Sequence, residues 1–183
     1  MLFRSRIPTP LSATRFRVRE DLFAFRKEAD LYVAEVAGDG ERSVDLFHSL
    51  AGELPDVVDF SMECFRSGRS FIGEGLRRDE VVEAIARLKV PLVASAGVEL
   101  SVFTADEQLS LSAMLDCWIY ATTDRWLALL IDRGFEEAAE LPRRSWTVKR
   151  ADFTGAPERG EAVPDAALRL TLTLTQTRDP THL

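Results

Sequence analysis

Alternating side chains over residues 98–121 restrict this chain to folds that contain a sheet with one buried face. In the segment "LSLSAMLDCWIYA" (109–121), every second position is occupied by Leu, Ala, Cys or Ile. A period of two is typical of a strand, because successive side chains of a strand point to opposite faces. We therefore expect one long strand over 109–121, with small and aliphatic side chains on one face and large rings on the other.

The preceding segment "VELSVFT" (98–104) is the expected antiparallel partner of this strand. If residues 105–108 form the connection, the apolar side chains of the two segments share one face of the pair. The expected cross-strand pairs are Val98 with Leu115, Leu100 with Ala113, and Val102 with Leu111.

Other segments predict the remaining strands and helices. Period-two or β-rich stretches predict strands at 31–37, 57–65, 145–153 and 168–177. Helices are expected where a capping residue precedes an apolar stripe. They run from Ser43 to Leu54, from Asp79 to Lys89, and from Asp124 to Gly134. A helix followed by two strands thus recurs, which predicts an α+β fold: a mostly antiparallel sheet with two or three helices packed on one face.

One domain is expected to account for most of the chain. A length of 183 residues with 46% hydrophobic residues is enough for a single ordinary core. We expect residues 1–30 to form a basic N-terminal arm that packs on the domain or leads into it. Residues 31–183 are expected to form the α+β domain, with a loop at 154–166 and a C-terminal strand.

The distribution of charge bears on the class of partner. The chain has a formal net charge of −7, which disfavours nucleic acid as the main partner. The first 27 residues contain seven basic and two acidic side chains, a net of +5, which leaves −12 for the remainder. The basic arm is therefore expected to lie on the acidic body or on a neighbouring copy, or else to be solvated.

Targeting signals are not evident in the sequence. No apolar run approaches the roughly 18 to 20 residues needed to cross a bilayer, and the N-terminus contains arginines without the apolar segment of a secretory signal. We therefore expect no membrane association and a cytoplasmic location. Cys64 and Cys117 lie in apolar strand-like segments, where a reduced, buried thiol is the common outcome; a disulfide between them is the alternative.

Motifs for metal binding or catalysis are weak. No C-x-x-C, H-E-x-x-H or EF-hand spacing occurs, so neither a metal site nor a cofactor is expected. A catalytic triad would have to use His48, because the other histidine, His182, lies in the C-terminal tail. The sequence favours a protein that is not an enzyme.

The stretch "CFRSGRSFIGEGLRRDE" (64–80) resembles a phosphate-binding loop only superficially. A Walker A loop needs Lys followed by Ser or Thr, but the corresponding positions hold Glu74 and Gly75. The stretch is better interpreted as a hairpin with a two-residue turn at Ser67 and Gly68, which places Arg66 opposite Arg69. A nearby carboxylate or solvent can compensate this like-charge pair, and the functional alternative is an anionic ligand or an acidic partner surface.

The outer face of the expected long strand is the second candidate site. Met114, Asp116, Trp118 and Tyr120 alternate onto it, and Phe103 joins them from the neighbouring strand. Such an apolar area needs a cover, which is either the C-terminal strands or N-terminal arm of the chain itself, or a partner. Aromatic and methionine side chains around one polar residue suit a protein partner or a second copy, and a small-molecule pocket has a similar lining.

Two functions follow from these candidate sites. The favoured one is a non-enzymatic protein-interaction or assembly module that uses the aromatic sheet face and the arginine-rich hairpin. The alternative is a domain that binds a small anionic ligand, or an enzyme with a pocket around Asp116, Trp118 and Tyr120. In the enzyme, Asp116 would act as an acid or base, because burial among aromatic side chains raises the pKa of a carboxyl group.

Overall fold

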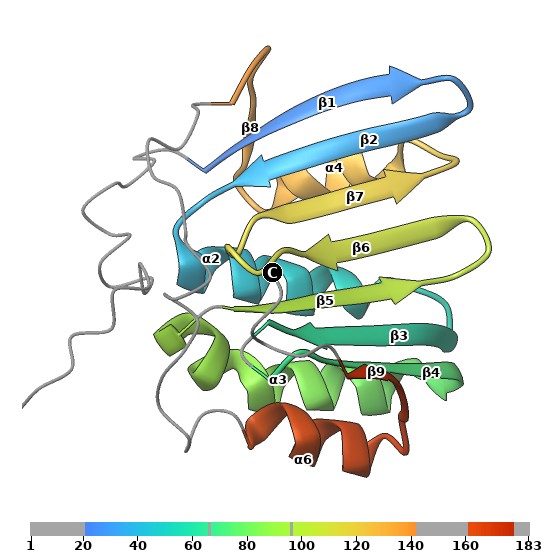
Figure 1. Cartoon of the computed structure of the whole chain (residues 1–183). Helices are drawn as coiled ribbons and strands as arrows, with labels where there is room; N and C mark the ends of the chain where they lie inside the picture. Colours follow the sequence, from blue (N-terminus) through green and yellow to red (C-terminus); the bar gives the residue numbers. More distant parts are fainter. Residues whose placement is uncertain (1–20, 66, 96, 142–160, 178–183) are drawn as a thin grey trace, which may run out of the picture.

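A computed structural model describes residues 21–65, 67–95, 97–141 and 161–177. Nine strands of these residues form one sheet in the order β8-β1-β2-β7-β6-β5-β3-β4-β9 (Figure 1). Every neighbouring pair is antiparallel except β1 and β8. Four helices accompany the sheet in the described part of the chain, so the expected α+β class is confirmed.

The described elements have the following bounds. The strands are β1 (Leu22–Glu28), β2 (Leu31–Ala37), β3 (Val57–Cys64), β4 (Arg69–Arg77), β5 (Val98–Phe103), β6 (Glu107–Leu111), β7 (Cys117–Ala121), β8 (Glu136–Glu137) and β9 (Thr173–Thr177). The helices are α2 (Gly40–Ala51), α3 (Arg78–Ser95), α4 (Arg125–Asp132) and α6 (Ala162–Arg169).

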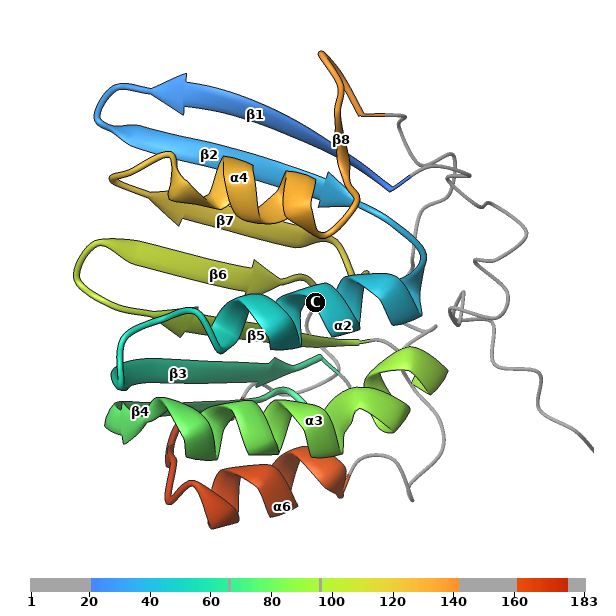
Figure 2. The same cartoon turned by 180° about the vertical axis from the view of Figure 1, so that it is seen from behind.

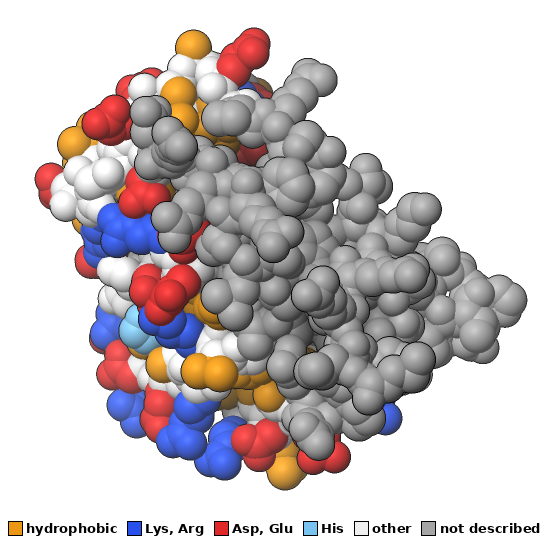
Figure 3. Space-filling view, turned by 90° about the vertical axis from the view of Figure 1, so that its left-hand side faces the viewer, with side chains coloured by type: hydrophobic (Ala, Val, Ile, Leu, Met, Phe, Trp, Pro, Cys, Tyr) orange, Lys and Arg blue, Asp and Glu red, His pale blue; other side chains and the backbone are white. Residues whose placement is uncertain are grey.

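The core lies between the helices and one face of the sheet. Figure 2 shows α2, α3 and α4 in front of the strands, with α6 beside α3. Phe47 of α2, Ile85 of α3 and Trp126 of α4 are buried there, with Phe60 and Leu100 of the sheet. Where Figure 3 is not grey, Lys and Arg side chains are interspersed with Asp and Glu side chains on the surface. Because these helices pack on one face, the opposite face of the sheet has no covering helix among the described residues (Figure 1).

The boundaries of α2 and α3 differ from the sequence prediction. Helix α2 is capped by Asp39, whose carboxylate accepts a hydrogen bond of 2.9 Å from the Arg42 amide, whereas the expected cap, Ser43, is buried inside the helix. Helix α3 continues through Pro91 instead of ending at Lys89. The buried Leu88 and Leu92 lie on either side of this proline. Their burial offsets the cost of a proline inside a helix.

The expected long strand over 109–121 is wrong, because these residues contribute to two strands of a hairpin. Strands β6 and β7 pair antiparallel, with Leu111 opposite Cys117. In the connecting turn, the Ser112 amide donates to the Asp116 carbonyl at 2.8 Å, and Leu115 adopts a left-handed φ of 66°. Ser112 Oγ accepts hydrogen bonds from the Met114 and Asp116 amides. The Ser112 side chain therefore satisfies two backbone amides of the turn, which in a continuous strand would need a partner strand.

The β5–β6 hairpin forms as expected, but with a different register. Leu100 pairs with Leu111 and Val102 pairs with Leu109, a shift of two residues from the predicted pairs. The turn is tighter than expected, because the Thr104 amide donates to the Glu107 carbonyl at 2.8 Å. A shift by two preserves the face on which each side chain lies, so the buried stripe is unchanged.

The β3–β4 hairpin corrects the predicted arginine pair. The cross-strand partner of Arg69 is Cys64, and not Arg66 as predicted. Arg66 itself lies outside the described residues. The Gly68 amide donates to the Cys64 carbonyl at 2.8 Å, and the left-handed φ of Gly68 makes this longer turn accessible.

The two ends of the domain also differ from expectation. Residues 22–28 of the predicted arm form β1, which pairs with β2. At the other end, α6 occupies part of the predicted 154–166 loop and the start of the predicted 168–177 strand, of which only β9 is a strand. The buried residues of this segment recur at helical spacing: Val163, Ala166, Ala167 and Leu170. Burial of this apolar stripe favours a helix over the strand that the alternating leucines predicted. The predicted strand at 145–153 lies outside the described residues.

Candidate functional site

A pocket of about 330 Å³ lies on the face of the sheet that is turned away from the helices. Strands β5, β6 and β7 build it, and we call this side of the sheet the pocket face. Its lining consists of Glu99, Gln108, Ser110, Ser112, Trp118 and Tyr120. Their neighbours along the strands, among them Leu100, Leu109 and Ile119, point to the opposite face and are buried in the core. Period-two alternation therefore fixes the direction of each lining side chain.

Strand register brings the lining residues together from three strands. Ser110 of β6 lies opposite Trp118 of β7 and Ser101 of β5. Ser101 Oγ and Ser110 Oγ are 2.8 Å apart, and Gln108 Nε2 donates to Ser110 Oγ at 2.9 Å. Both serines are 8% exposed. These three side chains therefore form a hydrogen-bonded polar row across β5 and β6, and two of them, Gln108 and Ser110, line the pocket.

An aromatic pair forms another side of the pocket. The Trp118 and Tyr120 rings are nearly parallel, with 6.3 Å between centroids and an interplanar angle of 11°. These two residues are separated by one position in β7, so their side chains share a face. The Arg26 guanidinium lies 6.0 Å from the Trp118 ring centroid and also forms an ion pair with Glu28. The Trp118 ring thus already interacts with one cation of the chain.

The electrostatic environment of the pocket is acidic. Glu99 lies directly opposite Glu63 of β3, and burial raises the pKa of Glu99, with a further contribution from the Glu63 charge. Burial also raises the pKa of Tyr120. The carboxylates of Glu28, Glu35 and Glu99 add to this increase, and Arg26 opposes it. Both shifts indicate that additional negative charge in this pocket is unfavourable.

The structure brings together some of the predicted site residues and separates others. Trp118 and Tyr120 line the pocket. Met114 and Asp116 belong to the turn before β7, and Ser112 Oγ donates to Asp116 Oδ2 at 3.4 Å. Neither Met114 nor Asp116 lines the pocket, so of the predicted lining of Asp116, Trp118 and Tyr120 only the two aromatic residues line it.

Phe103 and Arg69 lie farther from the pocket lining. Phe103 ends β5 opposite Gln108, which places it on the pocket face. Arg69 is on β4, which β3 separates from β5. The structure therefore does not bring Arg69 to the pocket.

Four lining residues were missed by sequence reasoning. Glu99, Gln108, Ser110 and Ser112 carry polar side chains at positions that alternate with the apolar stripe. The alternation indicates their common face, but only the register of β5, β6 and β7 indicates that they surround one cavity.

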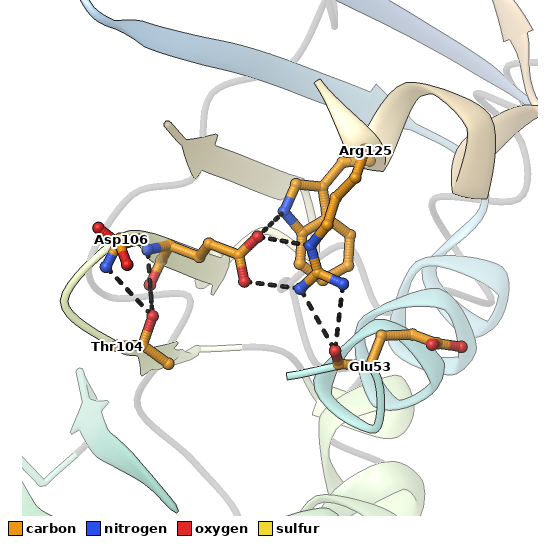
Figure 4. Close-up of polar contacts among 6 residues, drawn as sticks. Glu53, Thr104, Asp106 and Arg125 are labelled. Atoms are coloured by element: carbon orange, nitrogen blue, oxygen red, sulfur yellow. Dashed lines mark hydrogen bonds and ion pairs between the residues drawn. The ribbon is translucent and has the colours of Figure 1, made fainter. Parts of the chain in front are cut away.

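A second polar cluster lies at the end of the sheet (Figure 4). The Glu107 carboxylate accepts two hydrogen bonds of 2.6 Å from Arg125 and one of 3.1 Å from the Trp126 indole. Arg125 also donates to the Glu53 carbonyl, and its guanidinium lies 4.2 Å from the Trp126 ring centroid. These groups satisfy one another, so the cluster connects α4, β6 and the end of α2 and has a structural role.

Other features that could carry chemistry are limited in the described residues. Cys64 and Cys117 are free and buried, and burial raises the pKa of Cys117 to about 12. No group of three or more potential metal-binding side chains occurs within the part of the chain that the structure describes. None of the described helices has the length and apolar character needed to span a bilayer.

Comparison with other proteins adds no functional assignment. No protein family, curated protein or solved structure matches this chain. The chemistry of the pocket is therefore the basis for a functional proposal.

Proposed function

We propose that this chain is a non-enzymatic binding module whose pocket face contacts a protein partner and accepts one of its side chains in the pocket. The observation that carries this proposal is the pocket itself, which opens on one face of the paired strands and has Trp118 and Tyr120 as one side. Because the lining side chains project from hydrogen-bonded strands, their positions are set before a partner arrives.

The composition of the pocket face supports contact with a protein. Phe103, Trp118 and Tyr120 project from this face, and aromatic side chains are enriched at protein interfaces. Such anchors contribute most when a partner group fills a pocket beside them. In the pocket lining, Gln108 and Ser110 supply polar groups that can orient a bound group.

The hydrogen bonding of the pocket favours binding over catalysis. A nucleophilic hydroxyl needs an adjacent base that removes its proton. The Ser101 and Ser110 hydroxyls instead hydrogen-bond to each other, and Ser110 accepts from the Gln108 amide nitrogen, which is not basic.

We propose a cytoplasmic location, which the two free, buried cysteines support.

A small-molecule site is the second candidate function. The pocket volume of about 330 Å³ lies at the lower end of the range for small-ligand sites, which is roughly 300–1,000 Å³. A ligand that fills the cavity alone would not need Phe103, which lies on the same face but outside the lining. Truncation of Phe103 therefore distinguishes a partner surface from a small-molecule site.

Selection of a random-peptide display library against the full chain tests the proposed function. We expect enriched peptides whose affinity falls by tenfold or more in Trp118→Ala and measurably in Phe103→Ala. The matched control is Ile131→Ala, because Ile131 is a 54% exposed hydrophobic residue of α4, on the helix side. Circular dichroism establishes that each variant is folded.

The outcome that contradicts the proposal is equally specific. Peptides that bind Trp118→Ala as well as the original chain, or that are lost only in Ile131→Ala, would place the contact away from the pocket face. Failure of repeated selections to enrich any peptide would also count against a protein partner.

A further inference from the structure

We propose that the pocket recognises a basic side chain, the ammonium or guanidinium group of a partner's lysine or arginine, between the Trp118 and Tyr120 rings and the Glu99 carboxylate. This inference rests on the proposed binding function and names the chemistry of the bound group.

The first support is an uncompensated acid in the pocket lining. Among the described residues, the Glu99 carboxylate has no ion pair and no hydrogen bond, although it lies directly opposite Glu63. Half-burial and the neighbouring charge make its ionised form unfavourable, as the raised pKa of Glu99 indicates. A cation in the pocket would reverse this effect, because it adds a counter-charge that none of the described lining residues carries.

The second support is the aromatic pair. A lysine or arginine cation is attracted to the face of a tryptophan or tyrosine within about 6 Å of the ring centroid. The intramolecular contact of Arg26 with Trp118, at 6.0 Å, is an example at this ring. Since Arg26 is paired with Glu28, its charge is compensated outside the pocket. A bound basic side chain can also lay its apolar stem along the Tyr120 ring.

The third support is the set of hydrogen-bond acceptors. An ammonium group has three donors and no acceptor, and a guanidinium group has five donors. Gln108 uses its amide nitrogen for Ser110, which leaves its Oε1 atom as an acceptor for a ligand. Together with Glu99, Gln108 gives the pocket an acceptor-rich lining.

The net charge of the chain also favours a basic partner group. Residues 28–183 carry a formal net charge of −12, since the first 27 residues carry +5 of the total of −7. An acidic body attracts basic partner segments and repels anionic ones. The charge of this part of the chain therefore favours a cationic group over the anionic ligand of the alternative function.

Titration of the full chain with three probes of similar apolar length tests this inference. The probes are n-butylammonium, n-butanol and butyrate, and the readout is the indole N–H resonance of Trp118 in ¹H–¹⁵N NMR spectra, assigned by its loss in Trp118→Phe. We expect butylammonium to shift this resonance saturably, and the neutral and anionic probes to shift it much less. Glu99→Gln should weaken butylammonium binding by about fivefold.

Glu41→Gln is the matched control, because it makes the same charge change on the exposed N-terminal turn of α2. It should leave the affinity for butylammonium unchanged. Equal shifts with butanol or butyrate, equal affinity in Glu99→Gln, or no shift with butylammonium would each overturn the inference.

The two proposals fail in different ways. Display peptides that need Trp118 but lack lysine and arginine would leave the binding function intact and contradict the basic ligand. Peptides that do not depend on Trp118 would contradict both.

Discussion

At the end of the sheet, Glu107 is a single residue that accepts hydrogen bonds from more than one side chain of α4. Its side chain is 10% exposed, and it accepts hydrogen bonds from both Arg125 and Trp126. Removal of the carboxylate would leave a guanidinium and an indole N–H without their acceptor, and unmatched buried polar groups are costly. Glu107 therefore contributes to stability through the partners it satisfies.

We predict that Glu107→Ala lowers the free energy of unfolding by about 2 kcal/mol, measured by urea denaturation. This is less than for a fully buried pair, because the Arg125 side chain is 39% exposed. Asp165→Ala is the control, since it breaks the solvent-exposed pair with Arg169 in α6 and should have a much smaller effect. Equal losses in the two variants would contradict the structural role of Glu107.

Glu99 is predicted to make stability depend on pH. Its pKa is raised above the ordinary 4.5 by burial and by Glu63, so the folded chain binds more protons than the unfolded chain between these two pKa values. Stability from this group therefore falls as pH rises through that window. We expect Glu99→Gln to be more stable than the original chain at pH 7 and equally stable below the ordinary pKa. Urea titrations at the two pH values measure this, and a constant difference would contradict it.

At the scale of elements, Gly75 determines the irregular end of β4. It has a left-handed φ of 64°, and its amide donates to Asp59 Oδ1 at 2.8 Å beside the register shift between β3 and β4. We predict that Gly75→Ala costs about 1 kcal/mol, because a Cβ disfavours this conformation. The cost in Gly75→Asn should be smaller, because asparagine tolerates it better. Equal urea midpoints for Gly75→Ala and the original chain would refute this reason for the glycine.

Hairpins show which parts of the fold the sequence could predict. The alternation correctly predicted that residues 98–103 and 117–121 are strands, because a strand with one buried face requires an apolar side chain at every second position. It could not reveal the turn at residues 112–116, since Leu111 and Cys117 are separated by an even number of positions and the alternation stays in phase. The hydrogen bonds of Ser112 that close the turn are a local signal too weak to be recognised without coordinates.

The candidate site was predictable to a similar extent. Trp118 and Tyr120 were expected on one face because they alternate with buried positions, and they do line the pocket. Asp116 was expected beside them, but the turn removes it from the strand. Glu99 and Gln108 could not be placed there, because their proximity depends on the register of three strands, which one sequence does not determine.

For the whole molecule, the sheet order separates the two cysteines. Cys64 is on β3 and Cys117 is on β7, with β5 and β6 between them. At about 4.8 Å per strand, their backbones are roughly 14 Å apart, which is too far for a disulfide. The alternative of a disulfide between them is therefore wrong, and both thiols are free.

We predict that neither thiol reacts with Ellman's reagent in the folded chain and that both react after denaturation in guanidinium chloride. Burial keeps the reagent away from both side chains, and the pKa of about 12 for Cys117 keeps its reactive thiolate form rare. Because both cysteines lie in central strands, their rate of labelling should follow global unfolding. Rapid labelling of either thiol under native conditions would show that the sheet opens locally.

Mapping of a bound peptide by NMR tests the pocket face most directly. A peptide obtained by display selection is titrated into the full, ¹⁵N-labelled chain, and the perturbed backbone amides are identified. We predict that they cluster in β5, β6 and β7, around Glu99, Gln108 and Trp118. Perturbations confined to α2, α3 and α6, on the other side of the sheet, would contradict the assignment of binding to the pocket face.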